Sequence, residues 1–141
     1  MTTKDYLNQI NRLNMLINNK LLEISQYREL SCSISAVKNE EKVMTSPNQD
    51  KIGTNIAKID EMERKLDEII DDYITLKEKI KQQINKLPKR KHKIILYEKY
   101  IKFKSISEIS KKMDMTDRGC KKAHKKALEE FEKINKIQYT V

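Results

Sequence analysis

Glycine, proline and tryptophan are scarce in this sequence. Its 141 residues contain two glycines, two prolines and no tryptophan. Because glycine and proline are the residues that most often interrupt helices, their scarcity favours an all-α fold over one rich in turns and strands. The two cysteines, Cys32 and Cys120, are too few for a disulfide framework and indicate a reducing compartment.

Long apolar runs are also absent. No stretch approaches the roughly 18 apolar residues that a membrane-spanning helix needs. No apolar segment typical of a secretion signal follows Met1. The sequence therefore predicts a soluble, cytoplasmic protein without a membrane partner.

Positive charge is distributed unevenly along the chain. The net charge is +9, yet residues 1–87 contain 14 Lys or Arg and 14 Asp or Glu, whereas residues 88–141 contain 16 and 7. A lysine-rich composition that merely reflects an AT-rich genome would spread this charge evenly. The excess in the C-terminal third instead indicates a polyanionic partner for that region.

Apolar side chains recur at helical spacing in two long segments, residues 4–30 and about residues 50–86. Residues 31–49 break the period and are predicted to form a long connection. The apolar positions are Tyr6, Ile10, Leu13, Ile17, Leu21, Ile24 and Tyr27 in the first segment, and Ile52, Ile56, Ile59, Met62, Leu66, Ile70, Tyr73, Leu76, Ile80 and Ile84 in the second.

Two long helices with narrow apolar stripes need partners that cover those stripes. The sequence predicts that they pair as an antiparallel, coiled-coil-like hairpin, which could also associate with a second copy to form a homodimer. Leu87-Pro88 ends the second helix, because proline has no N–H and disfavours helix in the residue before it. Residues 1–87 are therefore predicted to form a hairpin for oligomerisation or partner binding, and residues 88–141 a separate domain.

Two helices are predicted directly after Pro88. Residues 90–103 form the first, and they supply the core with Ile94, Ile95, Leu96, Tyr100 and Ile101. The spacing S-I-S-E is a capping box, in which Ser105 caps a short helix over about residues 106–113 and Glu108 reaches back to it.

A tight turn and a last helix complete this region. Asp114 tolerates the left-handed turn conformation better than most residues. Met115 can fill the core, and Thr116 is a good N-cap for the following helix. Helix, tight turn and helix are the arrangement of a helix-turn-helix.

The last helix has two opposite faces on a wheel of about 100° per residue. One face is apolar and the other is basic near its N-terminus only, because Glu129 and Glu132 return to the basic side further along. A recognition helix uses its N-terminal residues to contact bases and nearby phosphates, so the pattern predicts double-stranded DNA as the partner. The apolar face consists of Cys120, Ala123, Ala127, Phe131 and Ile134, and the basic stripe of Arg118, Lys121, Lys122 and Lys125.

Each candidate DNA-binding residue has a role suggested by its chemistry. Arg118 is the candidate for a base contact, since its guanidinium can pair with guanine O6 and N7. The three lysines of the basic stripe suit phosphates. Asp117 can accept a hydrogen bond from cytosine, although we favour an interaction with the helix dipole. Thr116 and Ser105, where the two helices begin, complete the set.

Enzymatic and metal chemistry find little support in the residues. Cys120 and His124 are four apart on a helix and could place two zinc ligands together, but Cys120 falls on the apolar face and no further ligands lie nearby. The sequence has no phosphate-binding glycine loop and no supported Ser/His/Asp arrangement. We predict that the chain is not an enzyme and binds no metal or cofactor.

The segment YIKFKSISEISKKMDMTDRGCKKAHKKALEEF resembles region 4 of sigma-70-type factors. Nearly the whole chain is similar to the small phage and prophage regulators of the ArpU/RinA-like group. The upstream similarity lies in SCSISAV, TSPNQDKIGTNIAKIDEME and IDDYITLKEKI, and the last helix shares His124, Ala127 and Leu128. The resemblance implies a DNA-binding helix-turn-helix and control of phage genes, such as late or lysis genes.

The chain also departs from this family. Asp114 stands where glycine is usual, and Gly119 and Cys120 replace a commoner polar and β-branched pair. The aromatic-rich segment with which a complete sigma factor captures melted promoter DNA is missing, so the resemblance implies a regulator that does not initiate transcription alone. The alternatives are a phage DNA-packaging component and a coiled-coil adaptor that contacts RNA polymerase.

Overall fold

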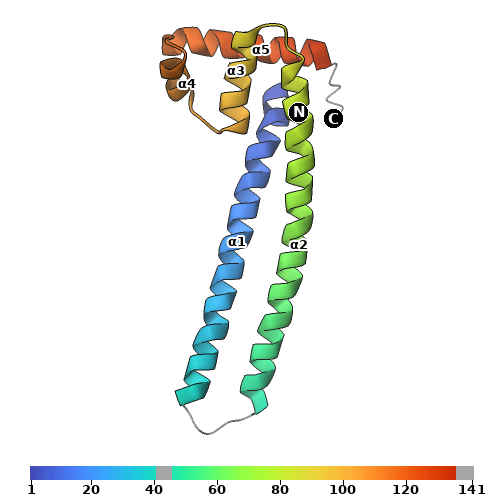
Figure 1. Ribbon diagram of the computed structural model, residues 1–141, viewed down its shortest axis with the longest axis vertical. Coiled ribbons are helices and arrows are strands. Elements are labelled where there is room, and N and C mark those ends of the chain that lie inside the picture. The colour runs from blue at the N-terminus through green and yellow to red at the C-terminus, as the bar shows by residue number, and fades with distance from the viewer. Residues whose placement is uncertain (41–45, 136–141) are drawn as a thin grey trace. The chain divides into compact units, whose positions relative to one another are not determined.

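The computed structural model contains only helices and their connections over the residues that it describes, 1–40 and 46–135, with side chains described for 1–32, 53 and 55–135. This confirms the predicted all-α fold class (Figure 1). No helix in these ranges has an apolar stretch of the length that crossing a membrane requires. The elements are α1 (Thr3–Glu40), α2 (Ser46–Asn85), α3 (Arg90–Leu96), the π-helix η1 (Tyr97–Ile101), α4 (Ile106–Lys112) and α5 (Asp117–Asn135).

The two long helices extend further than the apolar pattern predicts. Residues 31–40 continue α1 and residues 46–49 begin α2, so the predicted connection over 31–49 is wrong in both places; residues 41–45 lie outside the described ranges. Residues 31–40 contain neither glycine nor proline, and serine or asparagine disfavours helix by only about 0.5 kcal/mol each. Pro47 occupies the first turn of α2, where an N–H has no helical acceptor to lose.

The described chain divides into two compact units, and each is considered by itself. The hairpin unit is the segment Asn14–Asp72, and the terminal unit combines Met1–Leu13 with Tyr73–Val141. The predicted division at Leu87-Pro88 follows the end of α2 at Asn85. The first turns of α1 and the last turns of α2 belong to the same unit as α3, η1, α4 and α5.

In the hairpin unit, α1 and α2 pack along their apolar stripes. Leu21 and Ile56, predicted to lie in those stripes, are instead 50% and 52% exposed. A straight helix drifts about 20° per heptad, which carries such positions to the edge of the contact. Ile52 lies outside the described side chains. Arg28 and Glu63 form an ion pair between the helices. The buried residues are Ile24, Ile59 and Leu66, with Ile17, Tyr27, Met62 and Ile70 packed against them.

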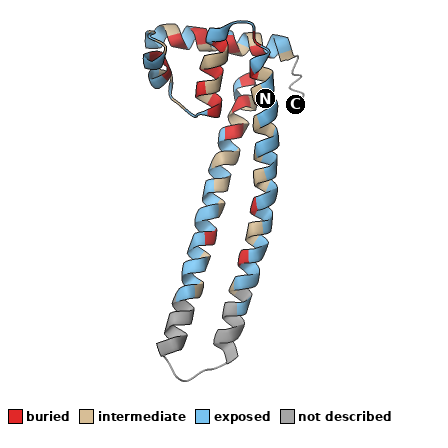
Figure 2. Ribbon diagram, viewed as in Figure 1, coloured by how far each residue is buried: buried red, intermediate tan, exposed pale blue. Residues whose placement is uncertain are grey.

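The main core of the terminal unit joins the start of α1 and the end of α2 to the C-terminal helices. The Tyr6 hydroxyl donates a hydrogen bond of 2.7 Å to Gln83 Oε1, which ties the start of α1 to the end of α2. Full burial of one large apolar side chain stabilises a fold by about 1.5–3 kcal/mol, so this core is the largest source of stability in the unit. Buried positions gather in these elements (Figure 2). They are Leu7, Ile10, Ile80, Ile84, Leu87, Leu96, Tyr100, Ile101, Ala127 and Phe131.

A smaller core beneath α4 fixes the helix-turn-helix. Asp114 adopts a left-handed conformation with φ of 58°, as the sequence predicts. The Met115 N–H then donates to the Ser110 carbonyl at 2.8 Å, which closes the end of α4. The buried members of this core are Ile95, Ile109, Cys120 and Ala123, with Ile106, Met113 and Met115 packed against them.

The helix predicted over residues 90–103 ends earlier and in a wider turn. It continues as η1 after α3, and the Lys102 N–H donates to the Tyr97 carbonyl, five residues back, at 3.2 Å. Phe103 then takes a left-handed conformation with φ of 58° and leads the chain away from the helix. Such π-turns within helices occur often at functional sites.

Candidate nucleic-acid interface

The basic stripe of α5 lies entirely at the surface. Arg118, Lys121, Lys122 and Lys125 are all exposed. On the opposite face, Cys120, Ala123, Ala127 and Phe131 are buried, which confirms the two predicted faces of this helix. Among the residues that the structure describes, no carboxylate forms an ion pair with the four cations. Their charge is therefore available to an external anion.

One member of the predicted apolar face does not belong to the core. Ile134 lies in the last turn of α5 and is 36% exposed. It borders an open polar cleft together with His92 and Glu130, so the prediction that it is buried is wrong. The apolar face of α5 therefore ends at Phe131.

The start of α5 is fixed by a side-chain cap. The Thr116 hydroxyl accepts a hydrogen bond of 3.1 Å from the Gly119 N–H, which confirms Thr116 as the N-cap. A Cβ atom added at Gly119 would lie 3.0 Å from that hydroxyl oxygen. The glycine at this position therefore leaves room for the capping hydroxyl of Thr116.

Asp117 connects the two helices of the motif. Its carboxylate accepts a hydrogen bond from the hydroxyl of Ser110, which is buried in α4. Sequence analysis assigned Asp117 to the helix dipole or to a base and did not identify Ser110. The spacing of seven residues across a tight turn is the signal that could have paired them.

Ser105 begins the first helix of the motif. Its hydroxyl accepts a hydrogen bond of 3.2 Å from the Glu108 N–H, which confirms its role as the N-cap of α4. The exposed side chains of Ser105 and Thr116 thus hold the two helix starts, and any contact with a nucleic acid would be additional to that role.

A buried carboxylate holds η1 against α4. Glu98 is almost fully buried, and it pairs with Lys112 of α4, with Lys104 at 3.1 Å and with Lys102 at 3.4 Å. The hydrogen bond from Lys112, followed by those from the other two lysines, lowers the pKa of Glu98 to about 2 against the opposing effect of burial. Sequence analysis missed this cluster, although Glu98 and Lys102 have the spacing of a helical ion pair.

His124 lies beside the basic stripe and contacts η1. Its Nε2 is 2.7 Å from the Tyr100 hydroxyl, and the two rings stack with centroids 5.7 Å apart. Burial, and then the charges of Lys99 and Lys4, lower the pKa of His124 to about 4. The imidazole is therefore neutral at pH 7 and shares a hydrogen bond with the Tyr100 hydroxyl. Cys120, the other residue of the possible zinc pair, is buried in the smaller core.

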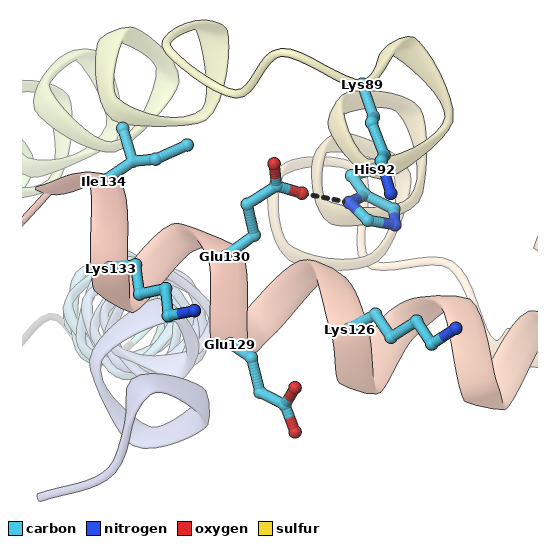
Figure 3. A pocket seen from close by; sticks show the side chains of 7 residues that line it. All are labelled: Lys89, His92, Lys126, Glu129, Glu130, Lys133 and Ile134. Carbon is cyan, nitrogen blue, oxygen red and sulfur yellow. Dashed lines mark hydrogen bonds and ion pairs between the residues drawn. The ribbon is translucent and has the colours of Figure 1, made fainter.

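A second polar tie joins α3 to α5. His92 is buried, and its Nδ1 lies 2.5 Å from Glu130 Oε2 (Figure 3). The pair sits in an open cleft of about 490 Å³ between the start of α3 and the C-terminal half of α5. The cleft combines both signs of charge. It is lined by Lys89, His92, Lys126, Glu129, Glu130, Lys133 and Ile134.

The arrangement presents a positively charged surface to which an anion could bind. The described residues assemble no group of three potential metal ligands. Several polar side chains tie helices together, and the four cations of the basic stripe lie outside, on α5, with no carboxylate partner among the described residues. Comparison of this chain with protein-family models, with curated proteins and with solved structures finds no match.

Proposed function

We propose that this chain is a phage-type transcriptional regulator, which binds double-stranded DNA through the helix-turn-helix of α4 and α5. The observation that carries the proposal is the basic stripe: four exposed cations on the N-terminal half of α5, opposite a buried face and without an ion-pair partner in the described part of the chain. Residues 88–141 hold the whole excess of nine positive charges, which supports the same conclusion.

In this proposal the N-terminal half of α5 enters the major groove. Arg118, in the first turn, contacts a base edge, and the lysines neutralise phosphates on either side. Each phosphate neutralised changes the slope of log K against log salt concentration by about −0.9. The hydrogen bond between Ser110 and Asp117 and the Thr116 cap support the proposal, because they give α5 a fixed orientation relative to α4.

The remaining chain completes the regulator. The hairpin unit presents two helices to a second copy or to RNA polymerase, and a dimer would favour two half-sites about one DNA turn apart. Control of late or lysis genes rests on the resemblance to the ArpU/RinA-like group. The absence of an enzymatic role is part of the same proposal.

Charge reversal on the basic stripe tests the proposal. Arg118→Glu with Lys122→Glu should lower the affinity for a mixed pool of duplexes at about 50 mM salt at least 100-fold, since two attractive contacts become repulsive. The matched control is Lys79→Glu with Lys86→Glu, which changes the net charge equally at two exposed positions, one in α2 and one directly after it. Fluorescence anisotropy gives the affinity, and thermal unfolding shows that both variants are folded. Equal affinities of the two variants would refute the proposal.

A further inference from the structure

A polar cleft of about 280 Å³ opens between the first turns of α1 and the chain that connects η1 to α4. It lies wholly within the terminal unit. Two amides one helical turn apart, two lysines and an aromatic ring surround it. They are Asn8, Asn11, Lys99, Lys104 and Phe103, with Ser105 at the start of α4.

The cleft continues the surface of the basic stripe. His124 follows Lys121 by three residues, so the two side chains are neighbours on α5. Tyr100, which bonds to His124, lines the cleft beside Lys99. The neutral His124 and its partner Tyr100 thus connect the basic stripe of α5 to Lys99 of η1.

The first turn of α1 adds another cation to this surface. Lys4 precedes Asn8 by four residues, which places both on one face of α1. The Thr3 hydroxyl bonds to Glu132 at 3.3 Å and holds this end of α1 against α5. Lys4 is close enough to Lys99 for its charge to act on it.

Lys99 has no internal counter-ion. Its side chain is half-buried, and the described residues offer it no carboxylate partner. Burial, followed by the charge of Lys4, lowers the pKa of Lys99. Lys104, by contrast, is paired with Glu98 at 3.1 Å. Two unpaired cations held close to each other are a destabilising arrangement that a bound anion would relieve.

Phe103 is the least expected residue of the cleft. A bulky side chain at φ of 58° is an outlier in a region that glycine and asparagine favour, and such strain is concentrated at functional sites. The ring is nevertheless 37% exposed, so burial of the ring alone does not account for the strained backbone conformation. It gives the cleft an apolar rim next to its amides and cations.

We propose that this cleft binds a backbone phosphate of the same duplex, outside the segment contacted by α5. Lys99 and Lys4 supply the charge, the amides of Asn8 and Asn11 donate hydrogen bonds to phosphate oxygens, and Phe103 packs against the adjoining deoxyribose. The inference rests on the proposed function and extends the DNA surface to the start of α1.

Neutralising the cleft tests the inference on the full chain. Lys4→Gln with Lys99→Gln should lower duplex affinity about tenfold and reduce the salt slope by about 1 to 2, with the preferred sequence unchanged. Lys79→Gln with Lys86→Gln is the matched control and should change neither. The duplex can also be shortened from one end until the affinity of the wild type has fallen tenfold. The same shortening should not lower the affinity of the cleft variant further, because that variant has already lost the contact.

A second pair of variants introduces repulsion instead. Asn8→Asp with Asn11→Asp should weaken binding more than the glutamine variant does, whereas Asn18→Asp with Asn19→Asp, on the same helix in the hairpin unit, should have little effect. Cleft variants that match their controls in both affinity and salt slope would overturn the inference alone, provided that charge reversal on the basic stripe abolishes binding. A wild type that binds no duplex would overturn the proposed function as well.

Discussion

The hairpin unit and the terminal unit are both helical, but they are held together differently. The hairpin unit has a narrow line of buried side chains and, among its described side chains, one ion pair between its helices. The terminal unit has two cores, and polar side chains link its helices to one another. A narrow stripe specifies that two helices pair, whereas a core with distinct polar ties also fixes how each helix is oriented. The orientations of the helices in the terminal unit are therefore fixed, as a binding surface made from several helices requires.

Exposed apolar side chains reinforce the contrast. Among the described side chains of α1 in the hairpin unit, the large apolar residues that remain exposed are Met15, Leu16, Leu21, Leu22 and Leu30. In the terminal unit, the large exposed residues near the helix-turn-helix include Phe103, which borders the cleft discussed above. The hairpin unit thus exposes apolar side chains, on which the proposed association with a second copy or a partner would depend, and the terminal unit exposes the basic stripe.

Matched isoleucine truncations on α2 should separate the two units most strongly. Ile80→Ala, in the terminal unit, should lower the free energy of unfolding by about 4 kcal/mol, because Ile80 is fully enclosed. Ile59→Ala, in the hairpin unit, should cost about 2 kcal/mol, because the site lies at the edge of burial. Urea denaturation measures both, and equal costs would remove the distinction between the units.

Acid should weaken the terminal unit through Glu98. The pKa of this carboxyl is about 2 when folded, below its usual 4.5, so its contribution is complete above pH 5 and is lost as the pH falls towards 2. Because the lysine partners remain partly exposed to solvent, we expect Glu98→Gln to cost about 2 kcal/mol at pH 7. The difference between wild type and variant should shrink as the pH falls from 5 to 2. A difference that stays constant over that range would show that the pairing contributes nothing.

The two glycines provide the smallest test. Gly53→Ala, in the hairpin unit, should stabilise the chain by about 0.5–1 kcal/mol, since a Cβ there meets no atom within 4 Å. Gly119→Ala should gain less or should destabilise, because its Cβ would press on the capping hydroxyl of Thr116. Thermal unfolding of the two variants checks the order, and an equal gain at both positions would argue against the tight cap.

The helices and the basic stripe could be predicted from the sequence because their signals are local. Apolar periodicity identified α1, α2 and α5, and the caps Ser105 and Thr116 follow from residues three apart. Continuation of α1 through residues 31–40 was missed, because weak helix formers do not by themselves end a helix that is already established.

The ties within the terminal unit could not be predicted in the same way. His92 and Glu130 are 38 residues apart, and Tyr6 and Gln83 are 77 apart, so only the folded chain brings them together. Glu98 shows the same limit: its nearest partner in sequence was visible, but the contribution of Lys112 depends on how α4 packs against η1. The cleft beside Lys99 also needs α1 and η1 to meet.

The central claim is that the basic stripe is the part of the molecule that holds duplex DNA. Its most direct test is a salt titration of duplex binding by wild type, by Arg118→Glu with Lys122→Glu, and by Lys79→Glu with Lys86→Glu. We predict a steep decline of wild-type affinity with salt, a nearly unchanged curve for the Lys79→Glu with Lys86→Glu control, and no measurable binding by the stripe variant. Coinciding curves for the two charge-reversed proteins, or a wild type that ignores duplex DNA at low salt, would contradict the account.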